Sequence, residues 1–188
     1  MRMFLRKPVR ERDPLPVTMA GLRMGERALL VGIYDLAVTG VLAAKPGLSG
    51  NAAIAVSDDE HAERARRACA DAGVLADILT GPLDALSLDD GSIDVAIVQA
   101  SDPAIAGMSD AARDRVFREC YRVLRGGGRL IVMTAGAEGG VAALFRRRPP
   151  TIELASERIL SSLEHGGFRA SRLLAEREGA RFFEGLKG

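Results

Sequence analysis

The sequence is poor in the residues that build metal sites and disulfide frameworks. Its 188 residues include two cysteines and two histidines, and the cysteines, Cys69 and Cys120, lie far apart. A disulfide framework or a zinc site needs several such residues at close, regular spacing. The sequence therefore predicts no metal site and two reduced cysteines packed near the core.

Long apolar runs and an excess of one charge are also absent. No run reaches the roughly 18 residues that a membrane helix needs, and the basic N-terminus is not followed by a signal-type apolar segment. The formal net charge is +1, which excludes a surface that strongly seeks polyanions and disfavours nucleic acid as the main partner. We therefore expect a cytoplasmic protein that does not enter the membrane.

The composition is that of a soluble globular domain. Hydrophobic residues make up 47% of the chain and charged residues 27%, a balance that excludes disordered and membrane classes. Residues 1–16 carry five Arg or Lys before Asp13 and three prolines, which is typical of an N-terminal arm. No linker or repeat divides the remainder, so residues 17–188 are expected to form one domain.

Apolar runs typical of buried parallel strands alternate with helical segments along the chain. The expected strands are 28–31, 51–56, 75–79, 93–99 and 129–134, followed by a hairpin of 168–177 and 180–187. The expected helices begin after Asp35, at about Asp59, at Ser109 or Asp110, and at Thr151 or Ser156. This order predicts an α/β fold of three layers, with a doubly wound, mostly parallel seven-stranded sheet and one antiparallel edge strand.

The turn after the first strand is the natural place for a ligand. In nucleotide-binding α/β proteins this turn is rich in glycine, so that the backbone approaches the ligand closely and the next helix offers its N–H groups. Here it contains one glycine, Gly32, followed by Ile33, Tyr34 and Asp35. The turn is therefore in the expected position but lacks the usual composition.

Four separated segments resemble the class I S-adenosylmethionine-dependent methyltransferases, over about residues 17–187. The segments are LSLDDGSIDVAIVQ, FRECYRVLRGGGRLIVMT, HGGFRA and NAAIAVSDDEHAERARRACADAG. They are similar to the family's connector into strand four, its helix and glycine turn before strand five, its turn before the last hairpin, and its second strand with the following helix. Gly126 stands where the family usually has proline.

The resemblance implies S-adenosylmethionine as cofactor and assigns positions around it. Gly32 matches the first glycine of the family's GxGxG loop, Tyr34 stands where the second belongs, and Asp35 is a candidate polar contact. At the end of strand two the family has an acid that binds the ribose hydroxyls. Ser57 takes that place here, and Asp58 follows. Neighbouring strand residues point to opposite faces, so Asp58 is a substitute only if the strand end bends.

The resemblance also places two later stretches at the pocket. The connector with Asp84, Ala85 and Leu86 matches the region that contacts adenine, where Asp84 is either an acceptor for the adenine amino group or a solvated acid. Gln99 and Ala100 begin the stretch, continuing to Asp102, where substrate and methyl group meet in the family. No residue of the chain stands out as a catalytic base. His61 and His165 are expected to be structural or solvated.

Two functions remain open at this stage. One is S-adenosylmethionine-dependent methyl transfer to a small molecule, which needs only orientation and desolvation of a good nucleophile. The other is a non-catalytic binding or oligomer-forming protein of the same fold, a homodimer for example, whose cofactor pocket is closed by Tyr34. Three consecutive arginines, 146–148, are either a solvated loop or a site for an anionic group.

Overall fold

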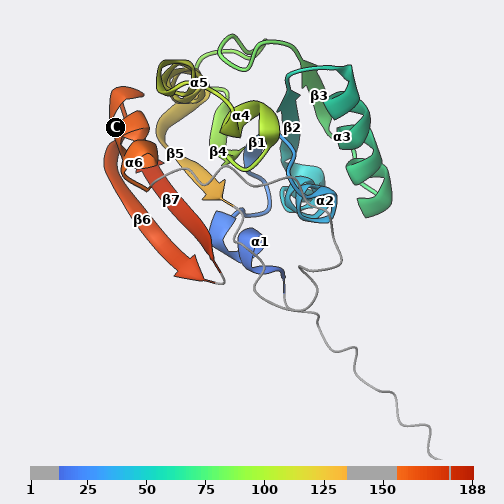
Figure 1. Ribbon diagram of the computed structural model, residues 1–188. Coiled ribbons are helices and arrows are strands. Elements are labelled where there is room, and N and C mark those ends of the chain that lie inside the picture. Colours follow the sequence, from blue (N-terminus) through green and yellow to red (C-terminus); the bar gives the residue numbers. More distant parts are fainter. Residues whose placement is uncertain (1–12, 135–155, 178) are drawn as a thin grey trace, which may run out of the picture.

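The computed structural model describes residues 13–134, 156–177 and 179–188 (Figure 1). Its seven-stranded sheet has the strand order β3-β2-β1-β4-β5-β7-β6. The strands are β1 (Arg27–Val31), β2 (Asn51–Val56), β3 (Asp77–Thr80), β4 (Ile93–Gln99), β5 (Leu124–Thr134), β6 (Arg169–Arg177) and β7 (Ala180–Leu186). Strands β1 to β5 pair in parallel, and β7 runs antiparallel between β5 and β6. The predicted fold is confirmed. The hairpin forms one edge of the sheet, with β6 outermost.

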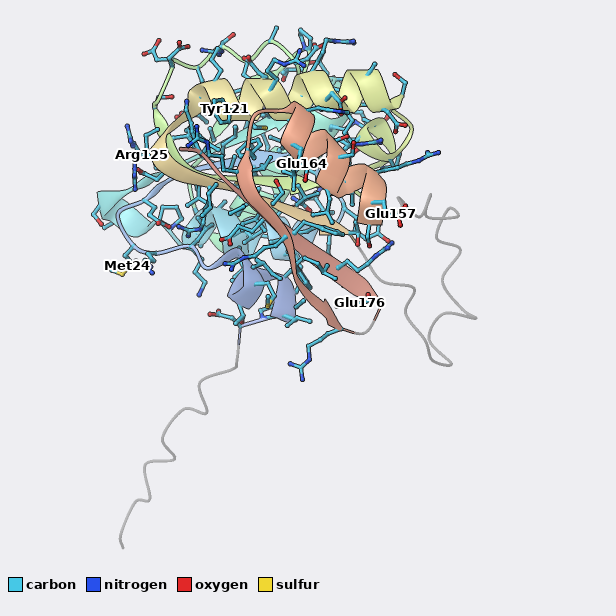
Figure 2. The ribbon with its side chains drawn as sticks, turned by 90° about the vertical axis from the view of Figure 1, so that its left-hand side faces the viewer. Met24, Tyr121, Arg125, Glu157, Glu164 and Glu176 are labelled. Atoms are coloured by element: carbon cyan, nitrogen blue, oxygen red, sulfur yellow. The ribbon has the colours of Figure 1, made fainter. Side chains whose placement is uncertain are left out.

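Helices cover both faces of this sheet. They are α1 (Leu15–Ala20), α2 (Leu36–Ala44), α3 (Asp59–Ala72), α4 (Pro103–Ala106), α5 (Asp110–Val123) and α6 (Ser156–His165), with the short 3₁₀ turn η1 (Gly47–Ser49). Alternate residues of the strands point to opposite faces of the sheet and belong to two separate hydrophobic cores. Leu30 packs with α1, α2 and α3, whereas Leu29 and Val31 pack with α5 and α6. Figure 2 shows α6, which carries Glu157 and Glu164, lying over the β6–β7 hairpin.

Helices α2 and α3 pack with their backbones in close contact. A Cβ atom added at Gly40 would lie 2.5 Å from the carbonyl oxygen of Ala68 and 2.9 Å from Cβ of Ala72. Glycine is therefore required for this approach, since any side chain would force the helices apart. The contact joins the middle of α2 to the last turns of α3.

Several predicted boundaries agree with the structure. Strands β2 and β4 and helix α3 have the expected limits, and helix α2 follows Asp35 as expected. Asp58 caps α3 by accepting from the N–H of His61 at 2.9 Å. Ser109 caps α5 by accepting from the N–H of Ala112 at 3.3 Å. The boundary expected after residue 16 falls inside α1.

Three local predictions were wrong or incomplete. Strand β5 begins at Leu124 instead of Arg129, because Gly127 and Gly128 pair with Lys187 at the end of the hairpin instead of forming a free turn. Strand β3 begins at Asp77 instead of Leu75, whose side chain is fully exposed. The short helix α4 was not expected. It begins at Pro103, directly after its capping residue Asp102.

Both cysteines are free and buried, as expected. Among the described residues, no helix has the length and apolar character needed to cross a membrane.

Candidate functional site

The carboxyl ends of β1, β2 and β4 meet where the strand order reverses direction, between β1 and β4. Ligands of open α/β sheets bind in the crevice at such a switch point. Three loops reach this place, one after each strand, and α4 lies in front of the ends of β1 and β4 (Figure 1). The predicted site residues of these loops are therefore brought to one region, and their contacts determine what the region can bind.

Gly32 makes the turn that ends β1. Its φ angle is +78°, a left-handed conformation that favours glycine. Its N–H donates to the carbonyl oxygen of Ala55 at 2.9 Å, which extends the pairing of β1 with β2 by one residue. Three residues later, Asp35 caps α2 by accepting from the N–H of Val38 at 3.1 Å. Asp35 therefore serves the start of the helix.

Gln99, the last residue of β4, binds the turn after β1 through both ends of its amide. Its Nε2 donates to the carbonyl oxygen of Gly32 at 3.1 Å and to Oγ1 of Thr39 at 2.9 Å. Its Oε1 accepts from the N–H of Tyr34 at 3.2 Å. The Gln99 side chain is buried, so these bonds satisfy a polar group that would otherwise be costly there. Gln99 therefore fixes the turn.

Asp102 completes this attachment, and its role was not predicted. Its side chain is 1% exposed. Oδ2 accepts from the N–H of Ile33 at 2.5 Å, and Oδ1 accepts from the N–H of Ala104 at 2.8 Å. A hydrogen bond to a buried carboxylate is among the stronger ones in proteins. One carboxylate thus caps α4 and also binds the turn after β1.

The face of Gly32 is covered by the segment that follows β4. A Cβ atom added at Gly32 would lie 2.6 Å from Cδ1 of Ile105 and 3.1 Å from Cβ and Oδ2 of Asp102. Residues of α4 and its capping residue therefore lie against this side of Gly32, where a side chain would not fit.

The end of β2 directs its polar groups toward α3. Ser57 is exposed and donates its hydroxyl to Oδ2 of Asp58 at 2.7 Å. Asp58 also binds the N–H and the ring of His61. The backbone N–H of His61 contributes most to holding the pKa of Asp58 well below its usual range, followed by the His61 ring and Ser57. Asp58 thus acts as the cap of α3.

The connector after β3 borders a pocket of about 240 Å³ lined by 78–82 and 85–87. Ala85 and Leu86 are among the lining residues. Asp84 instead accepts from Nε of Arg115 on α5 at 2.8 Å, a bond that lowers its pKa. The N–H of Leu86 donates to Glu119 at 2.7 Å. The connector is thereby attached to α5, and Asp84 is engaged away from the pocket lining.

Two further predicted residues hold their place in the site through backbone hydrogen bonds. Ala100 is buried, and its N–H donates to the carbonyl oxygen of Met133 at 2.8 Å. Tyr34 is half-buried, and its N–H is the group held by Gln99. Arginines 146–148 lie outside the described residues. His165 pairs with Asp114 at 3.1 Å, away from this region.

S-adenosylmethionine is the cofactor that the resemblance implies, and the turn after β1 is where its methionine part would lie. In this structure Ile105 and Asp102 lie beside Gly32. The N–H groups of Ile33 and Tyr34 in the same turn already donate to side chains. The two acids expected near the ribose and the adenine are engaged by α3 and by Arg115. The N–H groups of this turn are therefore bonded to side chains of the same chain.

Sequence reasoning placed Asp102 at the pocket but did not predict its bond to the turn after β1, and it missed Ile105 as a neighbour of Gly32. The dipeptide Asp102-Pro103 is a local signal for a helix start, because Asp is a good N-cap and Pro suits the first helical position. That signal predicts the cap alone. The second bond of Asp102 joins it to a residue 69 positions earlier, which no local pattern reports.

Comparison with known proteins agrees with the fold. A family model described as a methyltransferase domain matches residues 36–132, beginning directly after the turn described above. No curated protein matches the chain.

Solved methyltransferases share the architecture at low sequence identity. A SAM-dependent methyltransferase from Aquifex aeolicus superposes with a TM-score of 0.72 at 16% identity, covering 92% of this chain and 88% of that one. A SAM-dependent methyltransferase from Methanosarcina mazei superposes with a TM-score of 0.60 at 18% identity, covering 94% of this chain and 99% of that one. A putative O-methyltransferase from Nostoc punctiforme gives 0.69 at 14% identity, and 92% of this chain spans 56% of that protein. By its matching domain and its fold, the chain belongs to the class I S-adenosylmethionine-dependent methyltransferase family.

Proposed function

We propose that this protein is a non-catalytic member of the family, a binding or oligomer-forming protein whose cofactor site is closed by its own side chains. The observation that supports this proposal is the buried hydrogen bond from the N–H of Ile33 to Asp102, with Ile105 against Gly32. Together they take up both the donor and the space that the cofactor would use.

The closure is energetically substantial. A buried hydrogen bond to a charged group contributes about 1.5–3 kcal/mol. A ligand at the turn must break the bond between Ile33 and Asp102 and also move Ile105, which is fully buried. Its affinity falls by the free energy of that rearrangement, because only the open state binds it. The bond between Ile33 and Asp102 and the packing of Ile105 close the site without requiring the large side chain of Tyr34.

Calorimetric titration with S-adenosylhomocysteine tests the proposal. We expect no binding by the wild-type protein at millimolar ligand. The variant Asp102→Ala, which frees the N–H of Ile33, should gain binding. Asp59→Ala is the matched control, since Asp59 is an exposed acid in the first turn of α3. Micromolar binding by the wild-type protein would contradict the proposal.

A second candidate function is methyl transfer to a small molecule. The observation that favours it is the pocket of about 240 Å³ beside Ala85 and Leu86, in the region matched to the adenine contacts of the family. This function requires Asp102 to leave the turn when the cofactor binds. Thermal melting distinguishes the two functions, because a ligand at 100 times its dissociation constant stabilises a protein by about 2.7 kcal/mol. An unchanged melting temperature with the cofactor would exclude the second function.

The remaining expectations are part of the same proposal. The chain consists of an arm, residues 1–16, and one domain, residues 17–188, with α1 (Leu15–Ala20) spanning the boundary between them. It works in the cytoplasm, with a small molecule or a second copy of itself as partner and without nucleic acid. The near-neutral net charge of +1 supports this choice of partners.

A further inference from the structure

We propose that His61 and Arg64 of α3 form a latch that keeps the turn after β1 closed, with Asp58 orienting His61. The inference rests on the proposed function, because it concerns how the closed site is held. It gives α3, which follows the strand end matched to the ribose acid, a role in closing the same site.

Asp58 fixes the ring of His61. Nδ1 of His61 lies 2.7 Å from Oδ1 and 2.9 Å from Oδ2 of Asp58. The backbone N–H of His61 donates to Oδ1 of the same carboxylate at 2.9 Å. The His61 side chain is largely buried. A ring held at one nitrogen and enclosed in this way has its other nitrogen in a defined place.

That other nitrogen faces the carboxylate that closes the turn. Nε2 of His61 lies 3.8 Å from Oδ1 of Asp102, an ion-pair distance, and Oδ2 of Asp102 holds the N–H of Ile33. The ring of His61 thus lies between the carboxylates of Asp58 and Asp102, and it packs against the residue that closes the turn.

Arg64 binds the carbonyl oxygen of Ile33, the residue whose N–H is bound by Asp102. Its Nη2 donates to the carbonyl oxygen of Ile33 at 3.4 Å. His61 and Arg64 are three residues apart and share one face of α3. The carboxylates of Asp58, the cap of α3, and Asp102, the cap of α4, both lie near the ring of His61. The N–H of Ile33 is thus held through Asp102 and His61, and its carbonyl oxygen directly by Arg64.

The latch makes the position of α3 part of the closure. If α3 shifted away from β1, the contact of Arg64 with Ile33 and the contact of His61 with Asp102 would be lost together. His61 acts here through Asp102, so it is a positioning residue. Removal of the His61 side chain should weaken the hydrogen bond of the Ile33 N–H more than it weakens the backbone hydrogen bonds of β1, the strand before it.

Amide hydrogen exchange followed by NMR, without any cofactor, tests the latch. In His61→Ala we expect exchange of the Ile33 N–H to speed up about fivefold, as expected for loss of a contact worth about 1 kcal/mol. Asp58→Ser keeps a capping side chain but removes the carboxylate, and it should also speed up this exchange. His165→Ala is the matched control, because His165 pairs with Asp114 on α5, away from the turn.

Exchange at Leu30 in β1 shows whether the variants remain folded. The proposal is wrong if Leu30 stays protected in His61→Ala and the Ile33 N–H exchanges at the wild-type rate. It is equally wrong if His165→Ala has the same effect on Ile33 as His61→Ala. Because this readout uses no ligand, cofactor binding by the wild-type protein would contradict the proposed function and leave the latch to be judged by exchange alone.

Discussion

Arg113 is a charged side chain in a core position. The core-facing side of α5 also carries Val116, Phe117 and Cys120, and Arg113 lies one turn before them, fully buried. Nη2 of Arg113 bonds to Asp110, the first residue of the same helix. Within the described parts of the chain, neither Nε nor Nη1 has a hydrogen-bond partner. A buried donor without a partner destabilises the folded state by about 1–3 kcal/mol.

We therefore expect Arg113→Met to be neutral or stabilising by up to about 3 kcal/mol, because it replaces the buried guanidinium by an apolar chain of similar length. Urea denaturation measures the change, and Arg118→Met, at an exposed position of α5, is the control, expected within about 0.5 kcal/mol of wild type. A loss of more than about 1 kcal/mol in Arg113→Met would contradict this account.

At the scale of elements, the edge of the sheet opposite the candidate site is held by one acid. Asp94 in β4 accepts from the N–H of Arg27 in β1 at 2.8 Å, from its Nε at 3.1 Å, and from Nε of Arg125 in β5 at 2.6 Å. Figure 2 shows Arg125 at the beginning of β5. Hydrogen bonds from the Arg27 side chain contribute most to holding the pKa of Asp94 well below its usual range, against the effect of burial. Asp94 thus joins three neighbouring strands.

The lowered pKa of Asp94 predicts a defined pH dependence. Because the folded state favours the ionised carboxylate, its stabilising contribution is complete above the unfolded pKa of about 3.9 and is lost as the pH falls below that value. Asp94→Asn should be less stable than wild type by about 1 kcal/mol at pH 7, and the difference should shrink at pH 3. Urea denaturation at both values measures it. A difference that is the same at pH 7 and pH 3 would show that proton binding at Asp94 is not involved.

At the scale of the whole molecule, the two free cysteines lie in different layers. Cys69 on α3 belongs to the core shared with α1 and α2, and Cys120 on α5 belongs to the core shared with α6. Burial raises the pKa of the Cys120 thiol to about 12 and also raises that of Cys69. Each thiol therefore reports the opening of one side of the sheet.

We expect a thiol-alkylating reagent at pH 8 to label Cys69 well before Cys120, because Cys69 is slightly exposed whereas Cys120 is fully enclosed. Cys120 should react only at the rate of global unfolding. Mass spectrometry of the protein after timed labelling gives both rates, and unfolding in urea is the positive control. Equal labelling of the two residues in the native state would mean that the layer of α5 and α6 opens locally.

Much of the fold could be predicted from local patterns. Strands β2 and β4 are continuous apolar runs closed by polar residues, and α3 has a capping acid at one end and Gly73 at the other. The start of β5 could not be predicted in this way. The glycines after Leu124 have a turn-like sequence, yet their backbone groups pair with Lys187 of the distant hairpin.

The candidate site was predictable in place but not in its contacts. The end of β1 at Gly32, the end of β2 at Ser57 and the end of β4 at Gln99 lie together as the order of parallel strands requires. The sequence does not determine whether the side chain of Asp58 points to the loop after β1. In the structure this side chain caps α3. Its orientation depends on the helix that follows, because a cap satisfies N–H groups that would otherwise lack partners.

The sequence by itself determined the alternation of strands and helices and their order, because apolar periodicity, caps and turn residues are local properties. The family followed from the resemblance of four separated segments to those of known methyltransferases. Only the tertiary structure decided that Asp102 and Ile105 fill the space at Gly32 and that α3 holds the turn in place. These contacts join residues about 30 to 70 positions apart, and they exist because the parallel sheet aligns the carboxyl ends of its strands. The residues at that edge compete for the same few N–H groups, and packing selects which acceptor binds them.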